Sequence, residues 1–493
     1  MSFIIGIDIG TTNTKAIAFM DTGVVLAEAS CSYSPVTAPD GTFELDPRQL
    51  LEAVRTVLKE ALHRSAGNNA PAGNKGLAGV SFSCAMHSLL AVDGRGEPLT
   101  RAITWADQRS KRFADELKAS EAGRRIYRQT GVPIHPMSPL CKLLWMRQQQ
   151  PDVFGRAAKF ISIKEYIWWS FFGKYQVDHS IASATGLFDV YAVTWYRESL
   201  ELAGIREDQL SQPVPSTHWE SGPASPWRLE GLPDGLPFII GGSDGCMANL
   251  GSNAVTPGET ALTIGTSGAI RMTTTSLQYD AGERIFQYIL TDKLYVSGGA
   301  TNNGGGAVQW YASNFGGGRS VSELVSSVDN VGPGSDGLIF LPYLLGERAP
   351  IWNADAKALF FGIRSVHTQQ HFTRAVLEGI CYGLYQVGVS LEETIGPIRH
   401  IYASGGFTHS RAWLQMVADV FGRTVFTTNE GDASAIGACI MGFYALGIIP
   451  DLGAASRMIH VKEKYEADEG RHAIYRRGYD RFAALYDRLK DLM

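Results

Sequence analysis

Two short turns in the sequence have the composition of a phosphate-binding loop. Residues 10–12 (Gly-Thr-Thr) and residues 265–267 (Gly-Thr-Ser) each stand between apolar runs that are typical of strands. Glycine lets the backbone approach a phosphate closely, and the threonine and serine hydroxyls add hydrogen-bond donors. An ordinary polar hairpin has the same composition, so the turns indicate a phosphate site only together with other features.

The aspartate before the first turn is the candidate metal-associated residue. The Asp8 carboxylate would hold water around Mg²⁺, a cation that keeps several water ligands in phosphate sites. The sequence has no G-x-x-x-x-G-K-[ST] loop and none of the H-R-D or D-F-G segments of protein kinases. Phosphoryl transfer by this chain would therefore use a phosphate site of another kind.

Asp244 is the candidate general base. It follows the apolar run Phe238–Ile240, in residues 241–245 (GGSDG), which we expect to form a turn where a carboxylate can reach a ligand. An aspartate that only stabilises its own turn would occur in the same setting. The same stretch fits G-x-S-x-G with Ser243 at its centre. That pattern is the nucleophile elbow of serine hydrolases, a rival from another enzyme class.

A third group of side chains suits a polyhydroxylated ligand. Trp105 offers an apolar face to the C–H groups of a sugar, while His87, Asp107 and Arg109 can hydrogen-bond its hydroxyls; Met86 precedes the histidine. Each residue also has a purely structural explanation, as a core side chain or a surface ion pair. Two predicted strand ends that bear such groups in one domain favour a polyol site.

Glycine-rich loops carry the remaining candidates. Residues 405–406 (Gly-Gly) precede Ser410 and would let a nucleotide approach closely, although a plain turn with a helix N-cap is the alternative. Arg271, Glu347 and Arg348 are charged groups that we expect on such loops, where they would meet a phosphate or a carboxylate.

Strands and helices that alternate along the chain must position these groups. Apolar runs predict strands at Phe3–Ile9, Ala16–Phe19 and Val24–Ala29, the first two as a hairpin. Asp46 followed by Pro47 predicts the start of a helix. A polar loop over residues 66–76 and a strand at Leu77–Ser83 follow. This order favours an α/β fold.

The second half repeats the opening pattern. Strands are predicted at Thr260–Ile264 and Ala269–Thr273 on either side of the second Gly-Thr turn, which places the domain boundary near residue 252. Ala433–Leu446 predicts a helix with small residues on one face, and Tyr475–Leu492 predicts a charged, peripheral helix.

Composition narrows the class of partner. The chain has 493 residues, 45% of them hydrophobic, and a formal net charge of −5, which argues against nucleic-acid or anionic-membrane partners. Its six scattered cysteines include no C-x-x-C pair, so a reducing cytoplasm fits better than an oxidising compartment. The first residues predict a strand rather than a signal peptide.

Three longer stretches together resemble the FGGY family of carbohydrate kinases. They are GIDIGTTNTKA at residues 6–16, MSPLCKLLWMRQQ at residues 137–149 and ALFFGIRSVHTQQHFTRAVLE at residues 358–378. The resemblance spans essentially the whole chain. It implies two actin-like (ribonuclease-H-like) α/β domains, residues 1–252 for the sugar and 253–493 for ATP, around a central cleft whose closure excludes water.

The resemblance also assigns roles to residues. Asp244 would be the catalytic base and Asp8 the Mg²⁺-associated aspartate. The implied ATP-binding positions are Gly10, Thr11, Thr12, Asn13, Gly265, Thr266, Gly305, Gln309, Gly405, Gly406 and Ser410. The implied substrate-binding positions are Met86, His87, Trp105, Asp107, Arg109 and Asp244. A cytoplasmic enzyme with MgATP and a small sugar as its ligands is expected; a homodimer is compatible.

Within the family, the chain is most similar to members that phosphorylate gluconate. Members that phosphorylate xylulose come second, because they usually carry Gln before Met-His and Asn before the Asp of the Trp segment, where this chain has Ala85 and Ala106. A sugar acid needs a cationic partner for its carboxylate, and we expect Arg109 or Arg348 to supply it. A non-enzymatic actin-like nucleotide-binding protein is the third possibility, and the polyol group argues against it.

Overall fold

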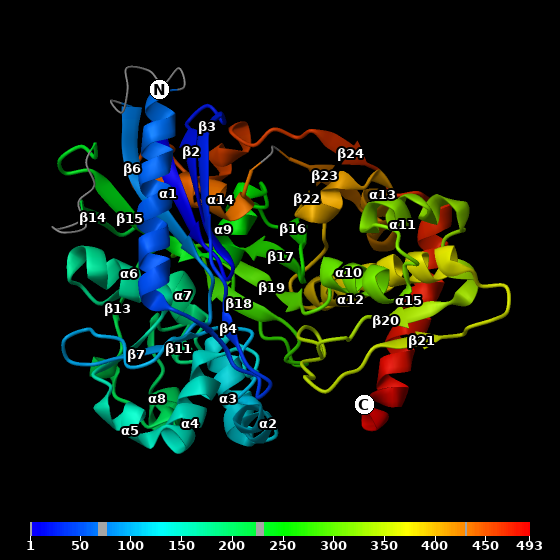
Figure 1. The fold of residues 1–493 in the computed structure, drawn as a ribbon, viewed down its shortest axis with the longest axis horizontal. Coiled ribbons are helices and arrows are strands. Elements are labelled where there is room, and N and C mark those ends of the chain that lie inside the picture. Colours follow the sequence, from blue (N-terminus) through cyan, green and yellow to red (C-terminus); the bar gives the residue numbers. More distant parts are fainter. Residues whose placement is uncertain (1, 68–75, 223–230, 429–430) are drawn as a thin grey trace.

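Two large sheets lie side by side, each with helices against it (Figure 1). The structure is a computed structural model and describes residues 2–67, 76–222, 231–428 and 431–493. Most of the polar loop expected at residues 66–76 lies outside the described residues. The first sheet has the order β14-β15-β6-β1-β2-β3 and the second the order β18-β19-β17-β16-β22-β23-β24.

The large-sheet strands are β1 (Phe3–Ile9), β2 (Asn13–Met20), β3 (Val25–Ser32), β6 (Leu77–Cys84), β14 (Trp219–Ser221), β15 (Pro237–Ser243), β16 (Glu259–Ile264), β17 (Gly268–Thr274), β18 (Phe286–Ile289), β19 (Tyr295–Thr301), β22 (His400–Ser404), β23 (Thr424–Thr427) and β24 (Glu463–Tyr465). The small-sheet strands are β4 (Val36–Thr37), β5 (Phe43–Leu45), β7 (Leu90–Val92), β8 (Ala102–Ile103), β9 (Lys159–Ile161), β10 (Gln176–Asp178), β11 (Phe188–Asp189), β12 (Thr194–Trp195), β13 (Gln212–Val214), β20 (Ile339–Leu341) and β21 (Leu359–Phe361).

The α-helices are α1 (Pro47–Gly67), α2 (Lys111–Lys118), α3 (Glu121–Thr130), α4 (Pro139–Gln149), α5 (Pro151–Arg156), α6 (Ile163–Phe172), α7 (His179–Ser183), α8 (Arg197–Ala203), α9 (Asp244–Gly251), α10 (Gly305–Phe315), α11 (Val321–Ser326), α12 (Gln369–Thr394), α13 (Arg411–Phe421), α14 (Ala433–Ala445) and α15 (Glu469–Leu489). The 3₁₀ turns are η2 (Glu207–Gln209), η3 (Val328–Asn330), η4 (Ser335–Gly337), η5 (Gly406–His409), η6 (Leu452–Arg457) and η7 (Lys490–Leu492). No helix among the described residues is long and apolar enough to cross a membrane.

The first sheet is covered on both faces, which explains why β1 is apolar almost throughout. Successive side chains of a strand point to opposite faces. Ile5 and Ile7 accordingly pack in the same cluster as the buried side of α1, whereas Ile4 packs in the cluster that contains α14. β1 pairs antiparallel with β2 and parallel with β6. The predicted opening hairpin is confirmed.

The second sheet repeats this arrangement. β16 pairs antiparallel with β17 across the second Gly-Thr turn and parallel with β22, as β1 does with β2 and β6. The long helix α12 packs against this sheet. Both halves of the chain therefore present a Gly-Thr hairpin at the corresponding place in their sheets.

Two helices join the halves through close contact of their backbones. α9 follows the last inner strand of the first sheet, and α14 comes from the second half of the chain but packs on β1, β2 and β6. A Cβ atom on Gly437 would lie 1.8 Å from the carbonyl oxygen of Met247, and one on Gly251 would lie equally close to that of Ala433. Only glycine fits at this crossing.

Three expectations from the sequence are corrected by the structure. Residues 241–245 are not a glycine turn, because β15 runs to Ser243 and Asp244 begins α9. Arg271 lies within β17 rather than on a loop. α15 runs along the outer edge of the molecule (Figure 1), but its Tyr475 and Phe482 are buried in the core of the second half, so the helix is not merely peripheral.

Candidate active site

A cavity of about 220 Å³ lies between the two halves of the chain and collects most of the predicted substrate residues. Its wall from the first half includes Met86, His87 and Trp105, and its wall from the second half includes Arg348. Asp244 lines the same cavity from the start of α9. Side chains more than 250 residues apart in the sequence therefore meet at one polar site.

The fold places Asp244 directly after a buried strand, at the start of α9. Ser243 caps α9, its Oγ accepting a hydrogen bond from the Cys246 N–H, and the Asp244 carboxylate accepts one from the Gly245 N–H at 2.8 Å. Burial raises the pKa of Asp244, and the charge of Arg271 opposes that rise. A carboxylate with a raised pKa at a cavity wall is suited to accept a proton from a ligand hydroxyl.

His87 is buried and neutral. Its Nδ1–H donates to the carbonyl oxygen of Ala184 at 2.8 Å, which leaves Nε2 as an acceptor, 3.4 Å from the Tyr288 hydroxyl. Burial, aided by the charge of Lys142, lowers the pKa of His87 to about 3. The imidazole can therefore orient hydroxyl groups in the cavity without contributing charge.

Trp105 connects the substrate wall to the first phosphate turn. Its Nε1–H donates to Thr11 Oγ1 at 3.1 Å, and the guanidinium of Arg348 lies 4.6 Å from its ring centroid. Thr11 itself lines the substrate cavity. The indole ring therefore spans the region between a cation and the Gly-Thr hairpin.

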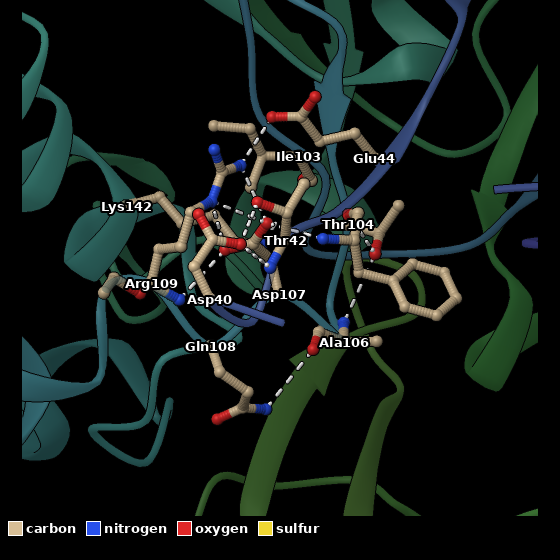
Figure 2. A network of polar contacts seen from close by, with 12 residues as sticks. Asp40, Thr42, Glu44, Ile103, Thr104, Ala106, Asp107, Gln108, Arg109 and Lys142 are labelled. Atoms are coloured by element: carbon tan, nitrogen blue, oxygen red, sulfur yellow. Dashed lines mark hydrogen bonds and ion pairs between the residues drawn. The ribbon is translucent and has the colours of Figure 1, made fainter. Parts of the chain in front are cut away.

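Asp107 and Arg109 form a partly buried network (Figure 2), and neither residue lines this cavity. Arg109 Nε donates to both Asp107 oxygens at 3.1 Å, and its Nη2 donates to Glu44 Oε1. Asp107 Oδ2 also accepts from the Phe43 N–H at 2.9 Å, while Trp145 stacks under the Arg109 guanidinium. The side chains of this pair form these hydrogen bonds with each other and with other residues of the first half of the chain.

Lys142 supports the strand ends that carry the substrate residues. Its buried ammonium donates to the carbonyl oxygens of His87, Ile103 and Met137. Burial lowers the pKa of Lys142 to about 7. This residue of the 137–149 stretch acts through the backbone next to the cavity.

Sequence reasoning did not place Arg271 or Tyr288 in the substrate cavity, which both residues line. Arg271 was expected on a loop, as a charged group that would meet a phosphate or a carboxylate, yet a charged residue inside an apolar strand was the available signal. For Tyr288, which comes from β18, no local pattern distinguished it from an ordinary core tyrosine.

A larger cavity of about 880 Å³ contains most of the predicted nucleotide residues. The predicted positions that line it are Gly265, Thr266, Gly305, Gln309, Gly406 and Ser410. Val308, Val325 and Trp413 give it an apolar wall, which suits a purine base. Ser410 also caps α13, so the N-cap alternative holds for it as well.

Gly405 lines a third cavity, of about 620 Å³, beside Lys15 and Asp432. Those two side chains form an ion pair at 2.7 Å. This cavity lies against β2 and the start of α14, so it borders the first hairpin.

The first hairpin is held by its own hydrogen bonds. The Gly10 N–H donates to the Asn13 carbonyl oxygen at 2.9 Å, and the Tyr33 N–H donates to the carbonyl oxygen of Thr12. The Tyr33 hydroxyl donates to the Gly10 carbonyl oxygen at 2.7 Å. Side chains at residues 11–13 thus project from a fixed turn.

Asp8 lies behind this turn in a region of negative charge. Its Oδ1 accepts from the Ser83 hydroxyl at 2.7 Å, and burial together with the charges of Asp432 and Asp244 raises its pKa well above the usual range. In the described part of the chain, no three His, Cys, Asp or Glu side chains could enclose a metal ion by themselves. The arrangement instead fits a cation held largely by water and phosphate oxygens.

The geometry does not support a hydrolase centred on Ser243. Its side chain is fully buried, and its Oγ is 2.7 Å from the Ser180 hydroxyl rather than exposed at the tip of an elbow. A nucleophile elbow requires an accessible oxygen with a histidine base beside it.

Comparison with known proteins places both halves of the chain. The model for the N-terminal domain of the FGGY family of carbohydrate kinases matches residues 3–251, and that for the C-terminal domain matches residues 260–446. Gluconokinase from Bacillus subtilis (strain 168) is 42% identical, with 93% of this chain and 90% of the relative covered. Xylulose kinase from Lactococcus lactis subsp. lactis (strain IL1403) is 30% identical, with 94% and 92% covered.

Solved structures agree with this placement. Gluconate kinase from Lactobacillus acidophilus superimposes with a TM-score of 0.93 at 32% identity, over 99% of this chain and 98% of that one. Ligand-bound xylulose kinase from the same organism gives 0.94 at 31% identity, over 99% of both chains. The predicted pair of actin-like domains is confirmed.

Proposed function

Because the chain belongs to the FGGY family of carbohydrate kinases, we propose that it transfers the γ-phosphoryl group of ATP to the terminal hydroxyl of D-gluconate, which gives 6-phosphogluconate. Two gluconokinase relatives exceed the xylulose kinases in identity over similar shares of the chain. A neutral ketose such as xylulose is the alternative substrate.

One observation carries this proposal: the second Gly-Thr turn separates the two cavities. Gly265 and Thr266 line the large nucleotide cavity, whereas the next two residues, Ser267 and Gly268, line the cavity of Asp244. A phosphate chain that enters from the nucleotide side would therefore end beside a substrate hydroxyl on the other side. This is the arrangement that in-line transfer needs.

The residues then have defined tasks. Asp244 accepts the proton of the terminal hydroxyl as that oxygen attacks the γ-phosphorus, and ADP leaves on the opposite side. The hydroxyls of residues 11, 12, 266 and 267 donate to the phosphate oxygens as charge develops on them. His87 and Trp105 hold the carbon chain of the sugar, one by hydrogen bonding and the other by its apolar face.

Asp8 would associate with Mg²⁺ bound to the ATP phosphates. Its buried carboxylate, with Asp432 and Asp244 facing it, provides the negative region that such a cation needs. When bound, Mg²⁺ neutralises charge on the phosphate oxygens. We also propose a domain boundary near residue 252 and, since the reaction consumes ATP, a cytoplasmic location.

ADP release tests the proposal. It is measured for the wild type, Asp244→Ala and Ser243→Ala with gluconate, xylulose, ribulose, glycerol and water alone. We expect gluconate-dependent turnover that Asp244→Ala abolishes and Ser243→Ala largely retains. A preference for xylulose would keep the mechanism but replace the substrate. Absence of turnover with every sugar would reject the proposal.

A further inference from the structure

Arg271 brings to the substrate cavity a cation with two N–H groups that lack a partner among the described residues. It lies in β17 and lines the cavity that contains Asp244. Its Nε and Nη1 atoms are buried, and neither has a hydrogen-bond partner in the part of the chain that the structure describes. Buried guanidinium groups without a partner are costly and uncommon, so the position indicates a ligand that completes the hydrogen bonding.

The surrounding backbone makes room for this side chain. A Cβ atom on Gly245 would lie 3.0 Å from Arg271 Nε, and one on Gly298 would lie 3.1 Å from its Cγ. Both positions are glycine, so the arginine reaches the cavity beside the first turn of α9. A larger residue at either glycine would crowd the arginine.

Arg348 supplies a second cation to the same cavity. Its Nη2 donates to the Thr301 carbonyl oxygen at 3.0 Å, whereas its buried Nε has no partner among the described residues. The adjacent Glu347 forms no ion pair with it, although the charge of Glu347 partly opposes the lowering of the Arg348 pKa by burial. That carboxylate accepts instead from the N–H groups of Asn302 and Arg348 and from the Asn303 side-chain amide.

The charges that line the cavity do not balance. Asp244 is the one acidic side chain in its wall, against Arg271 and Arg348, and His87 is neutral. Burial lowers the pKa of both arginines, as expected where positive charge is poorly compensated. A neutral polyol would leave this excess of positive charge in place, whereas a substrate with one carboxylate would compensate it.

We infer that Arg271, together with Arg348, binds the carboxylate of a sugar-acid substrate while Asp244 receives the hydroxyl at its other end; this inference rests on the proposed function. A guanidinium group presents paired N–H donors that match the two oxygens of a carboxylate. Arg271 is then the residue that separates sugar acids from neutral sugars at this site.

The competing role for Arg271 is support of Asp244 alone. The charge of Arg271 does lower the pKa of Asp244, yet the two side chains form no ion pair within 4.0 Å among the described residues. A supporting role would affect every substrate alike through kcat. A carboxylate-binding role would raise KM for the acid and leave neutral substrates little changed. The two roles therefore make different kinetic predictions.

The test compares Arg271→Met with the wild type and with the matched control Arg423→Met, whose arginine pairs with Glu392 away from the cavities. Steady-state kinetics are measured with gluconate, with its neutral analogue gluconamide and with xylulose, and gluconate binding is measured by calorimetry. We expect Arg271→Met to raise the gluconate KM and Kd at least about tenfold, as for loss of a charge-assisted pair. The KM values for gluconamide and xylulose should change less than about threefold.

Thermal unfolding completes the test. Arg271→Met replaces a cation whose buried Nε and Nη1 lack partners among the described residues with an apolar side chain of similar length, so its Tm should stay level or rise. An unchanged gluconate Kd, an equal loss of kcat with all three compounds, or a lowered Tm would overturn the inference. If the wild type does not phosphorylate gluconate at all, the proposed function itself fails, which is a separate result.

Discussion

Trp105 and Thr11 are joined by a hydrogen bond of 3.1 Å between the indole N–H and the threonine hydroxyl. The bond links the wall of the substrate cavity to the turn proposed to hold phosphate. A change in the position of one would therefore be passed to the other, and the sugar and the phosphate chain would be aligned by the same contact.

Replacement of Trp105 separates the two functions of its side chain. Trp105→Phe keeps an aromatic face under Arg348 but loses the donor to Thr11, so we expect kcat/KM for gluconate to fall about three- to tenfold, the net value of one hydrogen bond. Trp105→Ala also loses the apolar face, so its kcat/KM for gluconate should fall further. Steady-state kinetics check this against Trp169→Phe, a tryptophan stacked on Tyr175 elsewhere. Equal effects of Phe and Ala would contradict it.

Asp244 should determine the acid limb of the pH profile. The base must be ionised, and burial raises its pKa above the ordinary value, so kcat/KM should fall as pH decreases through that raised pKa. Arg271 and Arg348 oppose the rise, while Asp8 also faces the group. Arg271→Met should therefore move the limb to higher pH.

Asp244→Asn removes the base while keeping its shape. We expect kcat to fall by about 10²- to 10⁴-fold at every pH, the usual contribution of a general base. Substrate protection against thermal unfolding should persist, because the binding groups remain. A variant with near-normal kcat would assign the base to another residue.

Arg109 was a candidate for the substrate carboxylate, and the structure favours a different role. Its guanidinium holds Asp107 and Glu44 together, so Arg109→Ala leaves two carboxylates without their partner. Breaking a buried pair from one side costs about 3 kcal/mol or more, which should appear in urea unfolding. The exposed pair of Arg206 with Asp208 provides a control variant, Arg206→Ala, expected to change little. A large rise in gluconate KM with unchanged stability would restore the first hypothesis.

Much of the fold was predictable because its strands are apolar and because short local signals mark where helices and strands begin and end. β1 is buried along its whole length, and α1 begins at Pro47 as the Asp-Pro pair predicted. The start of α9 was missed because glycine-rich residues 241–245 suggest a turn. In the structure the Ser243 cap and the burial of the following residues outweigh that local preference.

Only those site residues that belong to recognisable sequence motifs could be predicted. Asp244, His87 and Trp105 were found in this way, and they do line one cavity. The lack of a hydrogen-bond partner for Arg271 Nε and Nη1 among the described residues could not be inferred, because the glycines at 245 and 298 meet this side chain only in the folded chain. The hydrogen bond between Arg109 and Glu44 could not be inferred either, because it joins positions 65 residues apart.

Gly406 offers a test of the nucleotide cavity that spares the fold. A Cβ atom there would meet nothing within 4 Å, and the residue lines the large cavity. Gly406→Leu should therefore fill space needed by ATP and raise its KM at least about tenfold, with little change in Tm. Gly155→Leu is the control, because Gly155 also has open space around it but lies on α5. Unchanged KM for ATP would place the nucleotide elsewhere.

A competition between two substrates in one vessel shows directly whether the protein prefers gluconate to xylulose. Wild-type protein receives MgATP with equal, limiting amounts of gluconate and xylulose, and both phosphorylated products are quantified over time. Their initial ratio gives the ratio of the two kcat/KM values without separate enzyme preparations. We expect 6-phosphogluconate to form in large excess with the wild type and this excess to be largely lost with Arg271→Met. Preferential formation of xylulose phosphate by the wild type would contradict this expectation.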